Sequence, residues 1–200
     1  MRDDTIAAYL DRLAARVPAP GGGAAAALHA AQAAALLAMV ARYSDGERYD
    51  AEMMNRIAAE ADVLREDALA LAEADTAAFA AVAEAYKLPR ETEDRSASIS
   101  AALADATRPP ADVVRTAVLL IRLAEELLSA GNHSMITDVA AAAVAIRAAA
   151  VTSRLMIEVN LKRITDQVLL DEFAATAAVT DAIEARADEI VRAVRQEIAL

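Results

Sequence analysis

Apolar residues recur along most of this chain at spacings of three, four and seven, which is the period of an α-helix. The pattern is clearest from Ala51 to Tyr86, whose spaced apolar positions are Ile57, Leu64, Ala68, Leu71, Phe79, Val82 and Tyr86. No stretch of useful length alternates with period two, as a half-buried strand would. The pattern predicts an all-α protein with helices over Thr5–Ala15, Ala24–Tyr43, Ala51–Tyr86, Glu93–Thr107, Ala111–Ala130, Met135–Leu161 and Asp166–Ile198.

Proline, glycine and capping residues set the predicted helix ends. Leu88-Pro89-Arg90 stops the long third helix, and Pro109-Pro110 is expected to end the fourth because proline has no N–H to donate. Gly131-Asn132 is a C-terminal cap signal, and Ser134 fits as an N-cap for the next helix. A chain of 200 residues has the size of one domain, so residues 1–200 are interpreted as a single helical domain.

Three of the predicted helices are small and apolar on nearly every side: Ala24–Tyr43, Met135–Leu161 and part of Ala111–Ala130. A helix that is apolar all round has to be covered on every side. Two hundred residues can enclose one such helix, but enclosing three is difficult. The surplus predicts a homo-oligomer, most simply a homodimer with an isologous helical interface.

Composition narrows the function classes. The chain has no cysteine, which excludes disulfides, thiolate chemistry and a cysteine metal site. A net charge of −11 argues against a nucleic-acid partner. Ala24–Tyr43 is long enough to span a membrane, but His29 and Gln32 would then lie in hydrocarbon, so a buried helix without membrane contact is favoured. The charged N-terminus does not begin a signal peptide, and a cytoplasmic location is expected.

A proline- and glycine-rich stretch from Val17 to Ala24 precedes the first long apolar helix. Pro18 and Pro20 favour an extended approach, and Gly21-Gly22-Gly23 permit positive φ and close contact with a ligand or another backbone. The helix N-terminus that follows suits an anionic or carbonyl-bearing ligand. The alternative is a tight turn that packs the helix against its neighbour. Neither nucleotide-binding fingerprint applies, because no strand precedes the glycines and no Lys-Ser/Thr follows them.

Two aspartates are candidate catalytic groups. Asp75 lies four residues after Leu71 and four before Phe79, within the predicted core-facing stripe, so burial should raise its pKa towards values useful for proton transfer. The alternative is a core carboxylate hydrogen-bonded to a neighbouring helix terminus. Asp138 follows Ile136 near a helix start, where an acid also simply complements the helix dipole.

Further candidates are polar residues at helix ends. Asn132 could supply left-handed geometry or bind a ligand, whereas His133 is expected at the surface and His29 in the core or an interface. The histidines are too far apart for a metal site, and no metal is expected. Asn160, Lys162 and Arg163 end an apolar helix, and Lys87 is the only other lysine. These cations either complement helix dipoles or receive the carboxylates of an acidic substrate.

Six motifs together carry a family resemblance. In chain order they are Pro18-Ala19-Pro20-Gly21-Gly22-Gly23, Asp75-Thr76-Ala77-Ala78-Phe79, Tyr86-Lys87-Leu88-Pro89, Gly131-Asn132, Thr137-Asp138 and Val159-Asn160-Leu161-Lys162. From about Tyr9 to Asp166 the chain resembles the cyclodeaminase domain of formiminotransferase-cyclodeaminase and its stand-alone bacterial relatives, which include methenyltetrahydrofolate cyclohydrolases. Each motif alone is weak, but six in order with compatible spacing are specific.

The resemblance implies an all-helical, intertwined homodimer that binds folate at the glycine-rich stretch and neighbouring helices. It implies formation of 5,10-methenyltetrahydrofolate from 5-formiminotetrahydrofolate with loss of ammonia, or interconversion of 5,10-methenyl- and 10-formyltetrahydrofolate. Neither reaction uses a metal or redox cofactor, and Asp75 maps onto the family's proton donor or acceptor. Ala24 replaces the family's serine, and Asp45-Gly46-Glu47-Arg48 replaces a turn that often carries lysines. The alternatives are a non-catalytic folate-binding dimer and a plain helical scaffold.

Overall fold

The structure is a computed structural model that describes residues 3–91 and 93–199. Within these ranges most of the chain is helical and there is no strand, so the predicted all-α fold class is confirmed. The helices are α1 (Ile6–Ala14), α2 (Gly22–Tyr43), α3 (Ala51–Lys87), α4 (Arg95–Ala130), α5 (Ile136–Leu161), α6 (Gln167–Ala178) and α7 (Thr180–Ile198), with a short 3₁₀ helix over His133–Met135 before α5.

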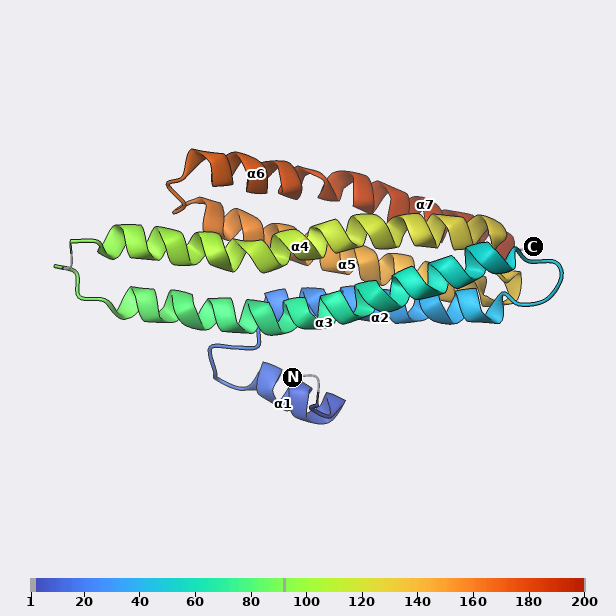
Figure 1. Cartoon of the computed structure of the whole chain (residues 1–200), viewed down its shortest axis with the longest axis horizontal. Helices are drawn as coiled ribbons and strands as arrows, with labels where there is room; N and C mark the ends of the chain where they lie inside the picture. Colours follow the sequence, from blue (N-terminus) through green and yellow to red (C-terminus); the bar gives the residue numbers. More distant parts are fainter. Residues whose placement is uncertain (1–2, 92, 200) are drawn as a thin grey trace.

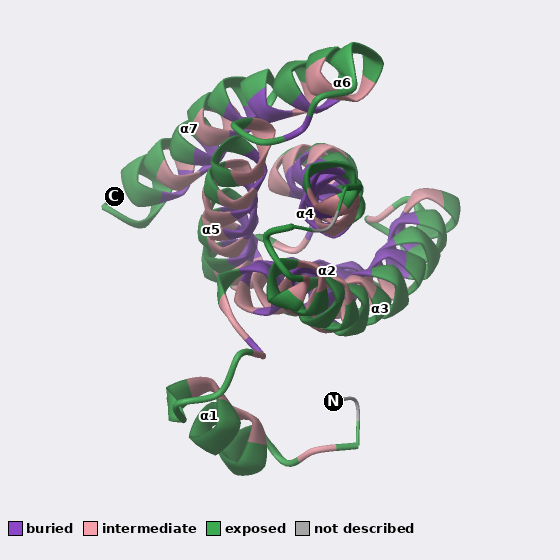
Figure 2. Cartoon of the chain, turned by 90° about the vertical axis from the view of Figure 1, so that its left-hand side faces the viewer, coloured by how far each residue is buried: buried purple, intermediate pink, exposed green. Residues whose placement is uncertain are grey.

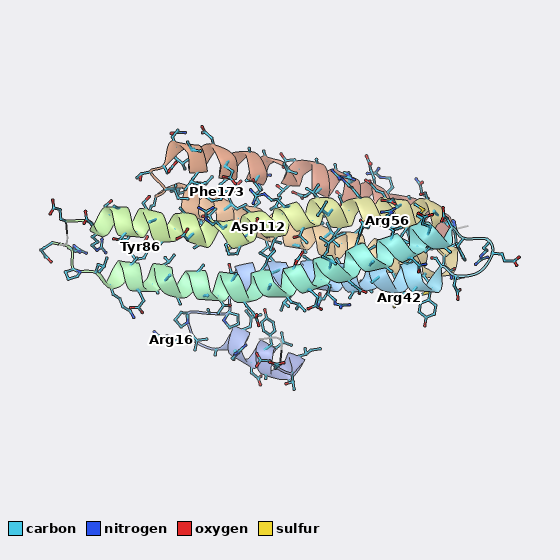
Figure 3. All side chains as sticks on the ribbon, in the orientation of Figure 1. Arg16, Arg42, Arg56, Tyr86, Asp112 and Phe173 are labelled. Atoms are coloured by element: carbon cyan, nitrogen blue, oxygen red, sulfur yellow. The ribbon has the colours of Figure 1, made fainter. Side chains whose placement is uncertain are left out.

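Four long helices, α2 to α5, form an elongated antiparallel bundle (Figure 1). Helix α4 contacts α2, α3 and α5, and α6 and α7 cover the side of α4 and α5 away from α3 (Figure 2). Phe173, which is 1% exposed, anchors α6 to the bundle (Figure 3). Helix α1 stands apart on the outer side of α2 and α3, and none of its residues is buried.

Alanine makes up much of the core. The inward side of α2 consists almost entirely of fully buried small residues, among them Ala26, Ala27, Ala30 and Ala34. Side chains this small allow neighbouring helices to approach closely, and α2 packs extensively against both α3 and α5. Larger aliphatic side chains from the other helices, such as Ile57 and Ile146, fill the remaining space.

The prediction that Pro109-Pro110 separates two helices is wrong. Helix α4 runs without interruption from Arg95 to Ala130 and contains both prolines, which are buried. A proline inside a helix removes one backbone hydrogen bond and costs about 3 kcal/mol. The packing of α4 against α3 and α5 outweighs this cost, because an interruption would expose the apolar surface on both sides of it.

The prediction of one final helix is also wrong, because the segment divides at Val179. Asp166 caps the start of α6, accepting hydrogen bonds from the N–H groups of Val168 and Leu169. At the division, the Thr180 hydroxyl donates to the Ala177 carbonyl at 2.7 Å. A threonine hydroxyl that bonds locally in this way competes with the helical backbone pattern.

Two helices are long and apolar enough to cross a membrane by length and composition, α2 and the segment His133–Leu161. In α2 the most apolar window is 61% buried inside the bundle, as expected for a core helix. Its cover is incomplete, however, since Gln32, Ala35 and Arg42 are exposed on its outer side. In the second segment the window is only 39% buried, which leaves an apolar side of α5 without cover in the single chain.

Candidate active site

The glycine-rich stretch forms the first turn of α2. Pro20 is buried and follows a cis peptide bond, and Gly21 is the extended N-cap residue with φ −138°. Gly22 and Gly23 already belong to the helix. The expectation of positive φ in this stretch was therefore wrong, and among the described residues only Gly46 adopts it. Of the three glycines, Gly23 is needed for space, because a side chain of α3 lies directly against it.

Asp75 of α3 occupies the space beside Gly23. A Cβ atom on Gly23 would lie 1.9 Å from Oδ1 of Asp75, a separation that real atoms do not reach. On its other side, a Cβ on Gly22 would meet Met156 at 3.6 Å and Thr152 at 3.9 Å, both on α5. The start of α2 is thus held between the carboxylate of α3 and two side chains of α5.

The Asp75 carboxylate acts as the cap that α2 lacks. Gly21 has no side chain to accept from the first N–H groups of the helix, and Asp75 accepts from the Ala24 N–H. Burial raises the pKa of the Asp75 carboxyl, while the Ala24 hydrogen bond lowers it by less. This contact matches the alternative interpretation of Asp75, a carboxylate hydrogen-bonded to a neighbouring helix terminus. The Asp75 carboxyl is also partly desolvated, and its pKa remains raised despite the hydrogen bond.

Asp75 marks the edge of the core. Its neighbours along the predicted stripe differ from expectation, because Phe79 is 49% exposed and Tyr86 is 39% exposed. The reason is the length of α2, which begins opposite Asp75 and leaves the remainder of α3 uncovered on that side (Figure 1). Asp75 is therefore half-buried and lies where the part of α3 that α2 covers ends.

Tyr9 brings α1 to this site. Its hydroxyl oxygen is buried and has no hydrogen-bond partner among the described residues. Burial raises the pKa of the Tyr9 phenol, nearby Arg12 lowers it, and the charge of Asp75 raises it. A small hollow of about 160 Å³, lined by Arg12, Pro20 and Thr76 among others, lies in the same region. Helices α1, α2, α3 and α5 thus converge around one carboxylate.

The sequence matches the model of one protein family over most of its length. The profile described as formiminotransferase-cyclodeaminase matches residues 5–179. The chain belongs to this family.

Relatives support this membership at the level of sequence and structure. The chain is 33% identical over 177 residues to a methenyltetrahydrofolate cyclohydrolase from Methylorubrum extorquens, covering 85% of both proteins. It is 31% identical to the formimidoyltransferase-cyclodeaminase of Mus musculus, of which it spans 33%. The crystal structure of formiminotetrahydrofolate cyclodeaminase from Thermotoga maritima superposes with a TM-score of 0.90 at 27% identity, covering 98% of each chain.

In this member of the formiminotransferase-cyclodeaminase family, Asp138 and Asn132 lie far from Asp75 within the chain. From Asp138 to Thr152 the helix rises about 21 Å, and from Gly23 to Tyr43 about 30 Å. The Asn132 side chain donates to the Tyr43 carbonyl at 2.7 Å and accepts from the Ser134 N–H at 3.0 Å. Asn132 therefore fastens the end of α2 to the turn before α5.

Of the caps predicted at this turn, Gly131 is confirmed as the C-cap residue of α4, whereas Ser134 as an N-cap is wrong. Gly131 has φ −82°, and it is required because a Cβ would lie 2.6 Å from the Leu127 carbonyl oxygen. The predicted N-cap, Ser134, lies within the short 3₁₀ helix, and the side chain of Asn132 does the capping. His133 is exposed, as predicted, and pairs with Glu197 at 2.6 Å.

The predicted basic residues gather at one end of the bundle. Arg163 donates to the Tyr86 hydroxyl at 2.9 Å, which joins the end of α5 to the end of α3. Lys162 is exposed beside it, Lys87 pairs with Glu84 at 2.6 Å, and Asn160 is half-buried. From Asp75 to Lys87 the helix rises about 18 Å. Tyr86 thus lies at the opposite end from Arg42 and Arg56 (Figure 3).

Sequence reasoning missed Tyr9, Thr152 and Met156. Tyr9 was placed only on the apolar side of a short helix, and Thr152 and Met156 lie in an apolar run without a polar motif. Their proximity to the glycine stretch depends on how α1 and α5 pack, which spacing along the chain does not encode. Within residues 3–91 and 93–199 there is no group of three or more His, Cys, Asp or Glu side chains that could hold a metal ion.

Proposed function

We propose that this chain catalyses a one-carbon reaction on a reduced folate, acting as a formimidoyltetrahydrofolate cyclodeaminase, a methenyltetrahydrofolate cyclohydrolase or both. Family membership and relatives carrying these two names support the reaction class. The observation that carries the assignment to a site is Asp75, a half-buried carboxylate of raised pKa at the N-terminus of α2. A carboxyl group whose pKa is raised by burial is a stronger base than an exposed one, and it can take a proton from the substrate and return it.

In the cyclodeaminase direction, folate N10 attacks the carbon of the protonated formimino group on N5. The resulting tetrahedral carbon carries an amino group, and the attacking N10 carries an additional proton. Amide ion is too poor a leaving group, so the proton has to move from N10 to the amino nitrogen before ammonia departs. We assign this transfer to Asp75, which takes the proton as a base and returns it as an acid, a role typically contributing 10²–10⁴-fold.

In the cyclohydrolase direction, the same carboxylate serves an attacking water. Water adds to the methenyl carbon and gives a proton to Asp75. The bond between that carbon and N5 then breaks as Asp75 returns the proton to N5, and the hydroxyl on the carbon releases its remaining proton to solvent as it becomes the carbonyl of 10-formyltetrahydrofolate. Both reactions thus require one group that moves a proton between two atoms attached to the same carbon, so no metal or redox cofactor enters the proposal.

The proposed substrate site surrounds the first turn of α2. Gly21 and Gly22 keep the accessible side of this turn free of side chains, so that a planar ring can approach the backbone, while the buried Pro20 and Gly23 hold the turn beside Asp75. The second catalytic candidate, Asp138, and the binding candidates Lys87, Asn132, Asn160, Lys162 and Arg163 remain proposals. For Asp138 and Asn132, a second copy of the chain would have to bring them to Asp75, because both lie far from it within one protomer.

A homodimer in the cytoplasm is the proposed form of the enzyme. Its support is the uncovered apolar side of α5, where Val144, Leu155 and Val159 are 55%, 56% and 58% exposed. These residues follow one another at helical spacing and form a stripe along the bundle. A second copy of the same stripe would cover it through an isologous contact.

The test is turnover by the purified chain. Methenyltetrahydrofolate absorbance is followed while 5-formiminotetrahydrofolate or 5,10-methenyltetrahydrofolate is supplied separately, with and without a chelator. We expect turnover of at least one substrate, unaffected by the chelator. Binding without turnover would support a non-catalytic folate protein instead, and the absence of both would support a scaffold.

Ala24→Ser distinguishes a disabled enzyme from an active one. Asp75 accepts from the backbone N–H of Ala24, a contact that is independent of the side chain. We therefore expect the original chain to be active and the serine to change kcat by less than threefold. Activity that arises only in the Ala24→Ser variant would overturn the proposal for the natural sequence.

A further inference from the structure

A slot of about 490 Å³ runs between α1 and the outer side of α2 and α3. Apolar side chains from both helices of the bundle form its floor, including Leu28, Ala31 and Leu69. The apolar side of α1 does not fill it, since Ile6 remains 80% exposed and Leu10 52% exposed. An apolar slot with open space is therefore present beside the candidate active site.

We propose that this slot binds the aminobenzoyl-glutamate half of the folate, with the ring between Leu28 and Leu69 and the glutamyl carboxylate on Arg65. The inference rests on the proposed function and adds the direction in which the substrate lies. It places the tail under α1, in place of the earlier proposal that the cations at the end of the bundle, such as Lys162, receive the folate carboxylates.

The slot begins near Asp75, the proposed proton-transfer group. Tyr9 forms one of its walls, and the same phenol is close enough to Asp75 for the carboxylate charge to raise its pKa. The buried Tyr9 hydroxyl, which has no partner within residues 3–91 and 93–199, supplies a hydrogen-bond donor and acceptor where the tail would join the folate head. A buried hydroxyl normally has a partner, and its absence here is explained by a ligand that provides one.

The slot has the correct length. Leu28 follows Gly23 along α2 by a rise of about 7.5 Å, and Leu69 precedes Asp75 along α3 by about 9 Å. Arg65 lies about 15 Å along α3 from Asp75. Standard bond lengths give about 10–12 Å from folate N10 across the ring and amide to the glutamyl carboxylate, and the arginine side chain reaches back across the remainder.

The far end of the slot carries the required polar groups. Arg65 pairs with Asp62 at 2.8 Å and with Glu66 at 3.2 Å, while Asp62 is also bound by Arg42. A guanidinium has five N–H donors, so these two pairs leave capacity for a ligand carboxylate. Gln32 lines the same end and can hydrogen-bond the amide of the tail.

A second hollow provides a matched comparison. It has a volume of about 510 Å³, lies between α3 and α4, and is lined by Arg56, Ala59 and Val63 among others. Like Arg65, Arg56 is an arginine of α3 that pairs with two acids, Glu60 and Glu126. Neither Tyr9 nor the glycine turn lines this hollow. Replacing Arg56 therefore measures the effect of losing an ion-paired arginine of α3 without a change in the proposed slot.

The experiment measures KM and kcat for Arg65→Ala, Arg56→Ala and Lys162→Ala with two substrates, methenyltetrahydrofolate and its pteroate analogue, which lacks the glutamate. We expect Arg65→Ala to raise KM about tenfold or more for the folate only, with kcat unchanged. Arg56→Ala should change neither constant. Equal increases for both substrates, or an increase with Lys162→Ala alone, would overturn the proposal.

Filling the slot gives an independent readout. Ala35 is exposed at its wall and Ala59 is exposed in the comparison hollow, so Ala35→Phe and Ala59→Phe should both keep the melting temperature. We expect only Ala35→Phe to raise KM, and unchanged KM with unchanged stability would contradict the proposed path. Turnover by the unmodified chain in the same assay tests the proposed function separately. Failure of the proposed function and failure of the proposed tail position are therefore distinguishable.

Discussion

A Cβ atom placed on Gly23 would lie 1.9 Å from Oδ1 of Asp75, so the first turn of α2 and the carboxylate of α3 share a space that admits no further atom. The same carboxylate accepts from the neighbouring Ala24 N–H. Gly23 therefore fixes the position of Asp75, and the absence of its side chain matters more than its backbone freedom.

Gly23→Ala should displace the Asp75 carboxylate and lower kcat by about 10²-fold, since a shift of about 1 Å in a reacting group can cost that much. Its effect on stability should be smaller. The overlap costs about 1–3 kcal/mol, whereas alanine gains up to about 1 kcal/mol over glycine in a helix.

Gly22→Ala is the matched comparison for kcat. Its added Cβ would meet Met156 at 3.6 Å, an ordinary contact that leaves Asp75 in place. Because Gly22 belongs to the proposed substrate site, we expect this variant to raise KM and to keep kcat, and kcat, KM and melting temperature are measured for both variants. A fall of kcat in Gly22→Ala to the same extent would mean that displacement of Asp75 is not the reason.

Asp75→Asn keeps the shape and hydrogen-bonding capacity of the side chain but removes the transferable proton. We expect kcat to fall by about 10²-fold or more with little change in folate affinity, because proton transfer acts in the transition state. Stability at neutral pH should hold or improve, since an amide is easier to bury than a charge. Asp67→Asn, at an exposed position of the same helix, serves as the control.

Turnover and melting temperature are measured on the same preparations of these two variants. A purely structural carboxylate predicts the reverse outcome, with a lower melting temperature and normal turnover in Asp75→Asn. Near-normal turnover by that variant would falsify the assignment.

The raised pKa of Asp75 predicts how stability changes with pH. The native state holds this proton more tightly than the unfolded chain, whose aspartates titrate near pH 3.9. Stability of the original chain should therefore fall, relative to Asp75→Asn, as pH rises from about 4 through the native pKa. Above that pKa the difference should be constant. Thermal unfolding of both proteins over this range provides the measurement, and a difference that changes in the opposite direction would mean that the Ala24 hydrogen bond dominates.

Leu155→Glu should convert the proposed dimer into a monomer. Leu155 is 56% exposed on the apolar stripe of α5, and a charge there would be buried without a partner in the assembly. Val168→Glu alters a residue that is 76% exposed at the start of α6 and does not belong to the α5 stripe, and it should leave the mass unchanged. Light scattering at micromolar concentration measures both, and a monomeric original chain would contradict the proposal.

The sequence by itself determined the helical class and most of the helices, because their apolar period is a local property. It also identified Asp75 and the glycine stretch as unusual, one as a carboxylate in an apolar stripe and the other as residues without side chains before a long helix. The predicted helix end at Pro109-Pro110 was wrong, since the sequence shows the local cost of two prolines in a helix but not the packing of α4 that offsets this cost.

Only the tertiary structure decided which candidates meet. Asp75, Gly23 and Tyr9 come from three different helices and converge because α2 begins part-way along α3, and because α1 lies beside the outer side of both. Asp138 and Asn132 are separated from them by the lengths of α5 and α2. Spacing along the chain defines the face of a helix on which a residue lies. The position at which α2 starts opposite α3 depends on long-range packing, and the candidate site forms at that position.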